Sequence, residues 1–466
     1  MDRNIDYVRS TVRLDPSQDQ FTIVPISSTA TRNLVTPQSG ALPRVIVAML
    51  GARRHYAVPR LLQEAGHLER FFTDGYIGNK LWLETMLNIF PSTKRPAVIQ
   101  RLLGRKEDAI PAKKVTSFDW LGLWYARAHR SATEAGSVEV IYGEAARRFA
   151  ENIRKHGLGD GNVLWGCNDA SLELFEYAKQ SGIHCILDQI SNPKPLQQVL
   201  AEEEYARWHG WVPSAERCIR KSSLEARERE EWRVADTVVA GSPFVERGLI
   251  ECGVPAHKIR VVPSGVDLRR FAPAARAAFG GPRPLRVLFV GRVSIMKGVP
   301  YLLQALNELG PKVVQARFVG GIHLNREKLI AFSDVGNFTG HIPRHSLPEE
   351  YRWADVFCFP SISEGSADVT YEALASGLPV ITTPNSGSIV QNDVDGFIVP
   401  IRDPDALAET IGRYASNREL LAQHQAATLQ RRERAGLDRY KADLVSAIRD
   451  ICRSEACREH PSGEFQ

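Results

Sequence analysis

Apolar runs alternate with segments of helical periodicity along most of this 466-residue chain. The first apolar run, residues 44–50, is followed by Gly51 and by a helix-like stretch over residues 58–65. A buried strand, a glycine turn and a helix are the opening of a parallel α/β sheet. The same alternation predicts further strands at residues 162–166, 183–187, 236–240 and 258–263.

A second series of the same kind begins after a connector. Residues 272–284 hold three prolines and two adjacent glycines, a composition typical of a linker. Open parallel sheets bind ligands at the carboxyl ends of their strands, so two such domains predict a cleft with a ligand on each side. The expected strands of the second series are residues 285–290, 316–319, 337–339, 355–359, 380–383 and 396–399, with helices such as 299–309 and 367–376 between them.

The pattern divides the chain into a flexible leader, two domains and a C-terminal helix with a tail, at residues 1–40, 41–257, 258–430 and 431–466. The leader is polar and rich in serine and threonine, without sustained periodicity. Residues 72–130 are less regular than their surroundings, and we interpret them as an insertion beside the first sheet that contributes to an acceptor region.

Composition narrows the class of protein. Apolar residues make up 43% and charged residues 24%, which is ordinary for a globular protein of two domains. The net charge of +5 is mild for this length and does not indicate a nucleic-acid partner. Seven cysteines without C-x-x-C spacing argue for a reducing compartment and against a zinc or disulfide framework. Without a signal peptide or an apolar run long enough to span a bilayer, we expect a cytoplasmic protein.

Basic residues are concentrated in residues 94–114, where seven lysines and arginines face two acids. Such a patch can meet anionic lipid or a phosphorylated acceptor. The alternative interpretation is a solvated helix and loop. Peripheral contact with the inner face of the membrane through residues 94–114 stays open beside that interpretation.

The strongest chemical signal lies in residues 361–381, where a strand ends, a glycine loop opens a helix and another strand follows. Glu364 stands in the loop and Glu372 in the helix, with seven residues between them. A carboxylate accepts two hydrogen bonds from vicinal hydroxyls, and a helix N-terminus offers free N–H groups to an anion. We expect Glu372 to hold a ribose and Glu364 a transferred sugar.

The second signal is a pair of cations in residues 289–298, directly after the first strand of the second domain. Arg292 supplies a planar fork of donors and Lys297 a point charge. A diphosphate leaving group develops negative charge as its glycosidic bond breaks. Two cations directed at that charge lower the barrier without a metal ion.

Together these segments resemble the signature of the retaining group 1 (family 4) glycosyltransferases, which have the GT-B fold. The resemblance implies two Rossmann-like domains whose parallel sheets face a central cleft, with the donor on the second domain. It implies catalytic roles for Arg292, Lys297 and Glu364. The implied donor-binding residues are Gly51, Gly291, Arg292, Lys297, Gly340, Ile342, Glu364, Gly365, Ser366, Ala367 and Glu372.

The chain departs from the family at three places. Ser366 and Ala367 stand where the family usually has Phe-Gly, and residues 264–267 resemble its Asn-Gly-Val-Asp turn with serine first. The family often has a histidine after a later strand of the first domain, and here Asp188 or Gln189 occupies that place.

Two histidines are loose substitutes for the missing one, His55 and His129. We expect the acceptor side to involve Asp188, Gln189 and His129.

Two patterns that mimic metal sites are set aside. Asp393 and Asp395 match a D-x-D motif but precede a strand where the family has only a loop. His341 and His345 have Pro343 between them and do not share a helical face. We expect no metal site and no cofactor beyond the nucleotide sugar itself.

The sequence therefore predicts a retaining, metal-independent glycosyltransferase of the hexosyltransferase type. Its expected donor is a nucleotide diphosphate sugar, and its expected acceptor is a sugar or a lipid-linked molecule in cell-surface polysaccharide or glycolipid synthesis. Two alternatives stay open at this point: a nucleotide-sugar epimerase of the same fold, and a non-catalytic nucleotide-binding scaffold.

Overall fold

The computed structural model describes residues 43–80, 85–87, 99, 102–132, 135–213, 224–273 and 283–458. The predicted leader lies outside these ranges, as do residues 274–282 of the predicted connector and Lys94, Arg95 and Arg101 of the basic stretch. Both sheets described below belong to one compact unit.

The first domain is built on a sheet of seven strands, which are β1 (Val45–Met49), β2 (Leu68–Thr73), β3 (Val115–Ser117), β4 (Val163–Cys167), β5 (His184–Gln189), β6 (Thr237–Ala240) and β7 (Ile259–Val261). Their order is β3-β2-β1-β4-β5-β6-β7, and all neighbours pair in parallel. The chain order reverses between β1 and β4, and such a switch point opens a ligand crevice at the carboxyl ends of the strands.

The second domain is built on a sheet of six strands, which are β8 (Leu285–Val290), β9 (Val314–Val319), β10 (Gly336–Gly340), β11 (Val356–Phe359), β12 (Val380–Thr382) and β13 (Gly396–Ile398). Their order is β10-β9-β8-β11-β12-β13, again all parallel. The switch point here lies between β8 and β11. The two parallel sheets confirm the predicted fold of two Rossmann-like domains.

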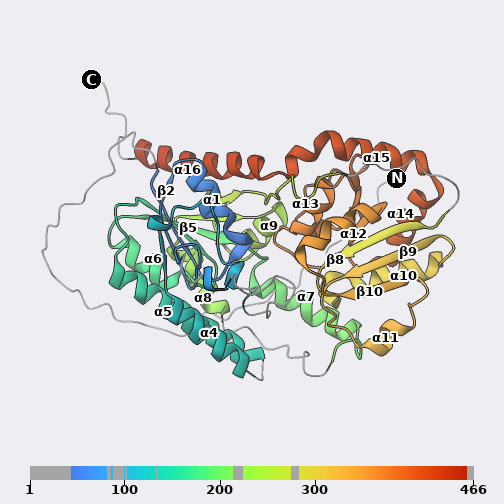
Figure 1. Ribbon diagram of the computed structural model, residues 1–466, viewed down its shortest axis with the longest axis horizontal. Coiled ribbons are helices and arrows are strands. Elements are labelled where there is room, and N and C mark those ends of the chain that lie inside the picture. The colour runs from blue at the N-terminus through green and yellow to red at the C-terminus, as the bar shows by residue number, and fades with distance from the viewer. Residues whose placement is uncertain are drawn as a thin grey trace, which may run out of the picture. The chain divides into compact units, whose positions relative to one another are not determined.

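Helices connect the strands in both domains (Figure 1). Those of the first domain are α1 (Ala57–Glu64), α4 (Asp119–Ser131), α5 (Ala135–His156), α6 (Leu172–Lys179), α7 (Lys194–Arg207), α8 (Glu225–Val234) and α9 (Pro243–Glu251). Those that follow are α10 (Val299–Leu309), α11 (Arg326–Ile330), α12 (Leu347–Trp353), α13 (Asp368–Ala375), α14 (Pro404–Ser416), α15 (Arg418–Arg431) and α16 (Leu437–Arg458).

Strand β1 is apolar throughout because both of its faces are buried. Val45, Val47 and Met49 join one core cluster, which includes residues of α1 and α16. Ile46 and Ala48, on the opposite face, join the cluster that holds residues of α5, α6 and α9. Side chains alternate between the faces of a strand, so a strand covered on both sides shows a continuous run rather than an alternating pattern.

The C-terminal helix α16 packs on the first sheet, although it follows the second in sequence. Tyr440, Leu444, Ile448 and Ile451 are buried in the same cluster as β1. Figure 1 shows α16 beside α1. These four buried residues of α16 are spaced by three or four positions, which gives the helix one apolar stripe.

Helix α7 runs from the first sheet to the core of the second. Lys194, at its start, contacts Glu228 of α8 through its backbone N–H at 2.9 Å. Near its end, the fully buried carboxylate of Glu204 accepts a hydrogen bond from Tyr301 of α10 at 2.9 Å and pairs with Arg402 at 2.5 Å. Trp208 then packs edge-on against Tyr301 at 5.0 Å. The sequence pattern did not predict this crossing.

The prediction of an insertion at residues 72–130 is wrong in part. Within this range β3 pairs with β2 and extends the sheet at its edge, and α4 follows. The sequence pattern missed β2 because Glu69 and Arg70 interrupt its apolar residues. Both side chains are half-buried between the buried residues Leu68 and Phe71.

We expect Leu444→Ala to destabilise the protein strongly, because Leu444 is fully buried between α16 and the first sheet. Deletion of a buried leucine side chain costs about 2–5 kcal/mol through lost burial and the cavity left behind. Chemical denaturation measures the change. Arg439→Ala, on the exposed side of the same helix, should cost less than about 1 kcal/mol. Equal effects of the two substitutions would show that α16 does not depend on this packing.

Candidate functional site

The two predicted glutamates, Glu364 and Glu372, lie at the switch point of the second sheet, on the segment from β11 to α13. Glu372 of α13 is only 6% exposed. Tyr351 of α12 donates a hydrogen bond from its hydroxyl to Glu372 Oε2 at 2.8 Å. This hydrogen bond from α12 therefore fixes the position of the Glu372 carboxyl group.

Burial raises the pKa of Glu372 to about 7, and the nearby Asp368 acts in the same direction. The hydrogen bond from Tyr351 and the positive charges of Arg344 and Arg270 oppose this rise. At neutral pH the group is therefore close to its titration point. Hydroxyl donors of a ligand would stabilise the charged form further, because a carboxylate accepts hydrogen bonds more strongly than a neutral acid.

The second glutamate, Glu364, forms an ion pair with Lys297. Lys297 lies in the loop after β8 and Glu364 in the loop after β11, so the structure brings the two predicted motifs together. Burial, followed by repulsion from Arg292, lowers the pKa of Lys297 to about 8. An anion that binds here would compete with Glu364 for the lysine.

The loop around Gly365 packs directly on the first sheet. A Cβ atom at Gly365 would collide with the carbonyl oxygen of Ile190, which follows β5. Ser242, at the start of α9, donates a hydrogen bond to the Gly365 carbonyl at 2.5 Å. The Ser242 hydroxyl also accepts a hydrogen bond from Val245 N–H and so caps the start of α9. Only glycine fits at position 365.

Two of the departures from the family pattern contact each other. Ser264 N–H donates to Ser366 Oγ at 3.4 Å, and the Ser264 hydroxyl donates to Asp368 Oδ1 at 2.7 Å. Ser366 in turn donates to the Tyr371 hydroxyl at 2.9 Å. The serines therefore form one hydrogen-bonded group that joins the turn at 264–267 to the start of α13.

Four more of the predicted donor-binding residues lie at strand ends or beside α13. Gly291 follows β8 with a φ of +142° and Gly340 ends β10 with a φ of +70°. Ile342 is half-buried against the core of the second domain, and the buried Ala367 precedes α13. Gly340 is two strands away from β8, roughly 10 Å at the usual strand spacing, so it lies at the side of the crevice.

Gly51, after β1, has its N–H occupied. It donates to Asp74 Oδ1 at 2.9 Å, and Asp74 pairs in turn with Arg105 at 3.0 Å. The Gly51 amide is thus directed at a carboxylate of the protein. Its φ of +84° shapes the turn that leads into the next loop.

The loop after β1 has a strained backbone. Arg54, His55 and Tyr56 all have positive φ angles, of 45°, 50° and 62°. For non-glycine residues this conformation costs roughly 1–2 kcal/mol each. Two arginine–tyrosine contacts hold the loop: Arg53 donates to Tyr142 of α5 at 2.5 Å, and Arg54 donates to Tyr440 of α16 at 2.8 Å. Strain that is held in this way is characteristic of functional sites.

His55, one of the loose substitutes, lies near arginines of the second domain. Partial burial, Arg344 and Arg270 lower the pKa of His55 to about 4. Its imidazole is therefore neutral at neutral pH.

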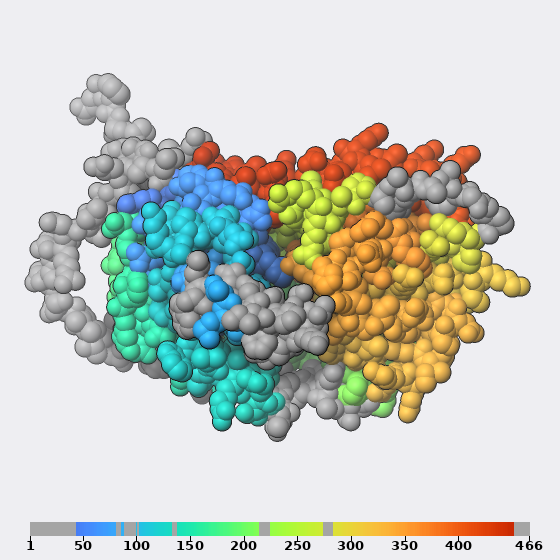
Figure 2. All heavy atoms as spheres, in the orientation of Figure 1, coloured from blue at the N-terminus to red at the C-terminus, as the bar shows by residue number. Residues whose placement is uncertain are grey.

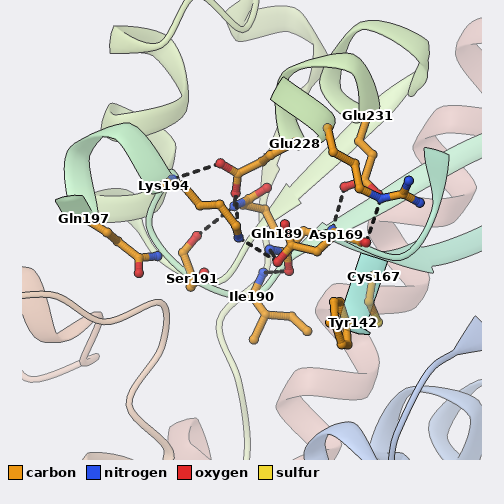
Figure 3. Close-up of polar contacts among 12 residues, drawn as sticks. Tyr142, Cys167, Asp169, Gln189, Ile190, Ser191, Lys194, Gln197, Glu228 and Glu231 are labelled. Carbon is orange, nitrogen blue, oxygen red and sulfur yellow. Dashed lines mark hydrogen bonds and ion pairs between the residues drawn. The ribbon is translucent and has the colours of Figure 1, made fainter. Parts of the chain in front are cut away.

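The predicted acceptor residue Gln189 is committed to the protein itself (Figure 3). Its amide nitrogen donates to the Ser191 carbonyl at 3.0 Å and to Glu228 at 2.8 Å, and its amide oxygen accepts from Trp232 at 2.9 Å. Asp188 is 2% exposed, and burial raises its pKa while Arg54 and Arg53 oppose the shift. Both residues lie at the carboxyl edge, but only Asp188 faces the strained loop.

His129, the third predicted acceptor residue, lies on α4. It is exposed and contacts the ring of Tyr125 at 5.9 Å. None of the contacts in the described ranges joins it to Asp188, so its acceptor role stays a prediction.

Two buried glutamates were missed. Glu231 of α8 accepts the backbone N–H groups of Asp169, Ser171 and Leu172 at 2.6, 2.8 and 3.2 Å, which caps the start of α6. Glu228, one turn earlier, accepts from Gln189 and from Lys194 N–H.

These glutamates fix the loops after β4 and β5 in place (Figure 3). The sequence carried no signal for them, because charges occur on every side of α8, which usually marks a solvated helix.

The two patterns that mimic metal sites show no metal-binding geometry. Asp395 is buried, and its Oδ1 accepts the Gln391 N–H at 2.7 Å. Among the residues that the structure describes, no three His, Cys, Asp or Glu side chains gather closely enough to hold a metal ion.

Comparison with known sequences matches two segments of the chain, one at the end of the first domain and one in the second domain. Residues 284–417 match the family model described as "Glycosyl transferases group 1", and residues 206–270 match that described as "Glycosyltransferase Family 4".

Two curated relatives illustrate the similarity. D-inositol 3-phosphate glycosyltransferase of Xylanimonas cellulosilytica is 30% identical over 255 residues, which cover 50% of this chain and 61% of that protein. WcaL of Escherichia coli (strain K12), a colanic acid biosynthesis glycosyltransferase, is 31% identical over 199 residues, which cover 40% and 48%. The chain spans about half the length of the curated relatives it matches.

Comparison with solved structures concerns the fold alone. HepE of Anabaena, solved with UDP and glucose, superposes with a TM-score of 0.57 at 14% identity and covers 88% of this chain and 100% of its own. Sucrose-phosphate synthase of Thermosynechococcus elongatus superposes with a TM-score of 0.60 at 19% identity, with the same coverage. The predicted GT-B fold is confirmed.

We expect the free energy of unfolding to fall as pH rises, in part because of Glu231. Burial raises its pKa from the ordinary 4.5 to about 8 in the folded protein. Between those pH values the folded state keeps the proton that the unfolded chain has released, so stability is lost as pH rises through this window. The shift corresponds to about 5 kcal/mol at most.

Denaturation of wild type and Glu231→Gln between pH 5 and pH 8 measures this effect. Because a glutamine side chain cannot titrate, the variant should show a shallower decline with pH. Glu230→Gln, at an exposed position of the same helix, is the matched control and should keep the wild-type slope. Parallel curves for all three proteins would show that Glu231 is ionised throughout.

Proposed function

We propose that the chain is a group 1, family 4 glycosyltransferase, which moves a sugar from a nucleotide diphosphate sugar to an acceptor with retention of configuration and without a metal ion. The observation that carries this proposal is the contact between Lys297 and Glu364 at the switch point of the second sheet, on the segment that leads into the helix of Glu372. This contact places a cation that suits a diphosphate next to a carboxylate that suits sugar hydroxyls.

The donor would be held by groups with matching chemistry. The Glu372 carboxylate suits the two hydroxyls of a ribose, while Lys297 and the exposed Arg292 suit a diphosphate. Structural neighbours support a nucleotide of this kind, since HepE was solved with UDP and with UDP-glucose. The identity of the base stays open between uracil and the others.

In the proposed reaction the bond between the anomeric carbon and the diphosphate oxygen breaks. A new bond forms from the same face to the acceptor oxygen, and the acceptor's proton passes to the leaving diphosphate. Arg292 and Lys297 stabilise the charge that develops on that group. Diphosphate binding would free Glu364 from Lys297, so that its carboxylate can hold the sugar. No protein nucleophile and no cofactor is required.

The ion pair favours transfer over the two alternatives. A scaffold that only binds nucleotide has no use for a carboxylate that exchanges between a lysine and a sugar. An epimerase needs an acid and a base beside the sugar, and on the first sheet Glu228 and Glu231 are committed to backbone amides and to Gln189.

The acceptor proposal follows the relatives. They include an enzyme named for D-inositol 3-phosphate and one named for colanic acid biosynthesis. We infer a sugar or lipid-linked acceptor, used in the synthesis of a cell-surface polysaccharide or glycolipid by a hexosyl transfer in the cytoplasm.

We expect Lys297→Ala to weaken binding of a nucleoside diphosphate by roughly 10- to 100-fold, the usual effect of losing a charge-assisted contact. Binding of the corresponding nucleoside should change little. Calorimetry with UDP, GDP and ADP and with the free nucleosides measures both. Lys328→Ala, at an exposed site on α11, is the control.

Two outcomes would count against the proposal. Equal losses for nucleoside and diphosphate would remove the diphosphate role of Lys297. Full retention of diphosphate binding in Glu372→Ala would remove the ribose role of Glu372, since a buried carboxylate that holds both hydroxyls cannot be replaced by a methyl group without loss.

Peripheral membrane contact is a further part of the proposal. No helix in the described part of the chain is long and apolar enough to cross a membrane. Within the basic stretch, Arg105 and Lys106 pair with acids, and Lys114 donates to the Leu68 carbonyl. These partners leave less free charge than the sequence suggested.

Helix α4 adds an exposed apolar group close to that stretch in sequence. Trp120 is 85% exposed and Leu123 is 57% exposed, and Arg127 and Arg130 continue the same helical face. Figure 2 shows α4 at the surface. A tryptophan and a leucine beside two arginines form a surface suited to an anionic lipid interface.

Replacement of Trp120 and Leu123 by alanine should reduce co-sedimentation with vesicles that contain anionic lipid. Ile330→Ala, equally exposed but on the second domain, should not. Vesicles of neutral lipid serve as the charge control and should bind wild type weakly. Undiminished sedimentation of the double variant would rule out this face as the contact.

A further inference from the structure

The strained loop after β1 carries two guanidinium groups that lack an acidic partner. Within the ranges that the structure describes, neither Arg53 nor Arg54 forms an ion pair with a carboxylate, and each has one hydrogen bond, to a tyrosine hydroxyl. A guanidinium group offers five N–H donors. Most of their donors are therefore available, although both side chains are half-buried.

The acids nearest to these arginines act on them only at a distance. Asp188 and Asp368 interact electrostatically with Arg54, and Asp169 does so with Arg53. In the described part of the chain, none of these carboxylates reaches ion-pair distance of either arginine. Asp169 pairs instead with Lys194 at 2.6 Å. Half-buried cations with spare donors and no carboxylate are the protein's half of an anion site.

The loop lies where a doubly wound sheet binds ligands. It follows β1, and its arginines interact with Cys167 at the end of β4 and with Asp188 in β5. These ends flank the switch point of the first sheet. The tyrosines add to the site, because each accepts from an arginine and keeps its own O–H for donation.

The site also lies next to the donor loop. A Cβ atom at Gly241 would lie 3.5 Å from Arg54 Nη2 and 3.1 Å from Ser366 Cβ. A group bound by Arg54 would therefore be a neighbour of the loop that holds Glu364 and Gly365.

We propose that Arg53 and Arg54, with the hydroxyls of Tyr142 and Tyr440, bind a phosphoryl group of the acceptor. Paired guanidinium forks match the oxygens of a phosphoryl group, and hydroxyl donors complete its shell. Assignment to the acceptor rests on the proposed function, because the donor's diphosphate already has Arg292 and Lys297 on the other sheet. The same chemistry would also suit the donor's phosphates, which the test separates.

The probe is inorganic phosphate, titrated calorimetrically into wild type, Arg53→Gln, Arg54→Gln and Lys297→Ala. We expect each arginine variant to weaken phosphate binding roughly tenfold or more, as loss of a charge-assisted contact does. Phosphate can also bind beside Arg292 and Lys297, so each arginine substitution is also measured in the Lys297→Ala background, in which the phosphate that still binds should be the phosphate held by the first sheet. Arg154→Gln, an exposed arginine of α5, is the matched control and should bind as wild type does.

A second arm uses UDP, GDP and ADP with the same variants. Nucleotide binding should survive in Arg53→Gln and Arg54→Gln and fall in Lys297→Ala. If nucleotide affinity falls with the arginines by the same factor as phosphate affinity, the site belongs to the donor and the acceptor assignment is overturned. Absence of phosphate binding to wild type at tens of millimolar would overturn the site itself.

Conservative variants guard against loss of folding. Tyr142→Phe keeps both arginines and removes one hydroxyl. Phosphate should therefore bind about threefold more weakly, a smaller loss of affinity than that caused by removing an arginine. Arg54→Lys keeps the charge without the fork and should fall between wild type and Arg54→Gln. Phosphate binding by a protein that binds none of the nucleotides would uphold this site while it removes the proposed function.

Discussion

The backbone contact between Gly365 and Ile190 determines where the two halves of the site meet. Because a Cβ atom at Gly365 would collide with the Ile190 carbonyl, the loop after β11 can lie against the loop after β5 only with glycine at that position. Ser242 then holds the Gly365 carbonyl from the first domain. Glu364, its neighbour, is thereby placed within reach of groups on both sheets.

Charge is distributed unequally around this contact. The buried carboxylates of the first domain, Glu228 and Glu231, accept hydrogen bonds from backbone N–H groups in the loops after β4 and β5. The cations Arg53, Arg54 and Arg292 have no acid in ion-pair distance in the described part of the chain. The acids of this site are hydrogen-bonded within the protein, while these three cations have no carboxylate partner among the described residues. Such a site suits substrates that carry negative charge, as a nucleotide diphosphate does.

The sequence predicted the parts of the fold and site that depend on local pattern. Most strands of both sheets follow from apolar runs, although β2 and β3 of the first sheet did not. The contact between Lys297 and Glu364 joins two motifs that were each visible alone. Asp188 or Gln189 stands where the family often has a histidine, but only the structure shows that Trp232 and Glu228 occupy the amide of Gln189. Glu231 was invisible because burial of a glutamate depends on distant amides, which no local pattern encodes.

Helix α7 has a mechanical consequence. Its first residue, Lys194, is tied to α8 and to Asp169, and its last turn is tied to the second domain through Glu204, Tyr301 and Arg402. Any rotation of the second domain relative to the first must therefore displace one end of this helix or bend the segment before it. That segment contains Ile190 and Ser191. Movement of the second domain is therefore transmitted along the continuous backbone to the loop after β5, at the carboxyl edge of the first sheet.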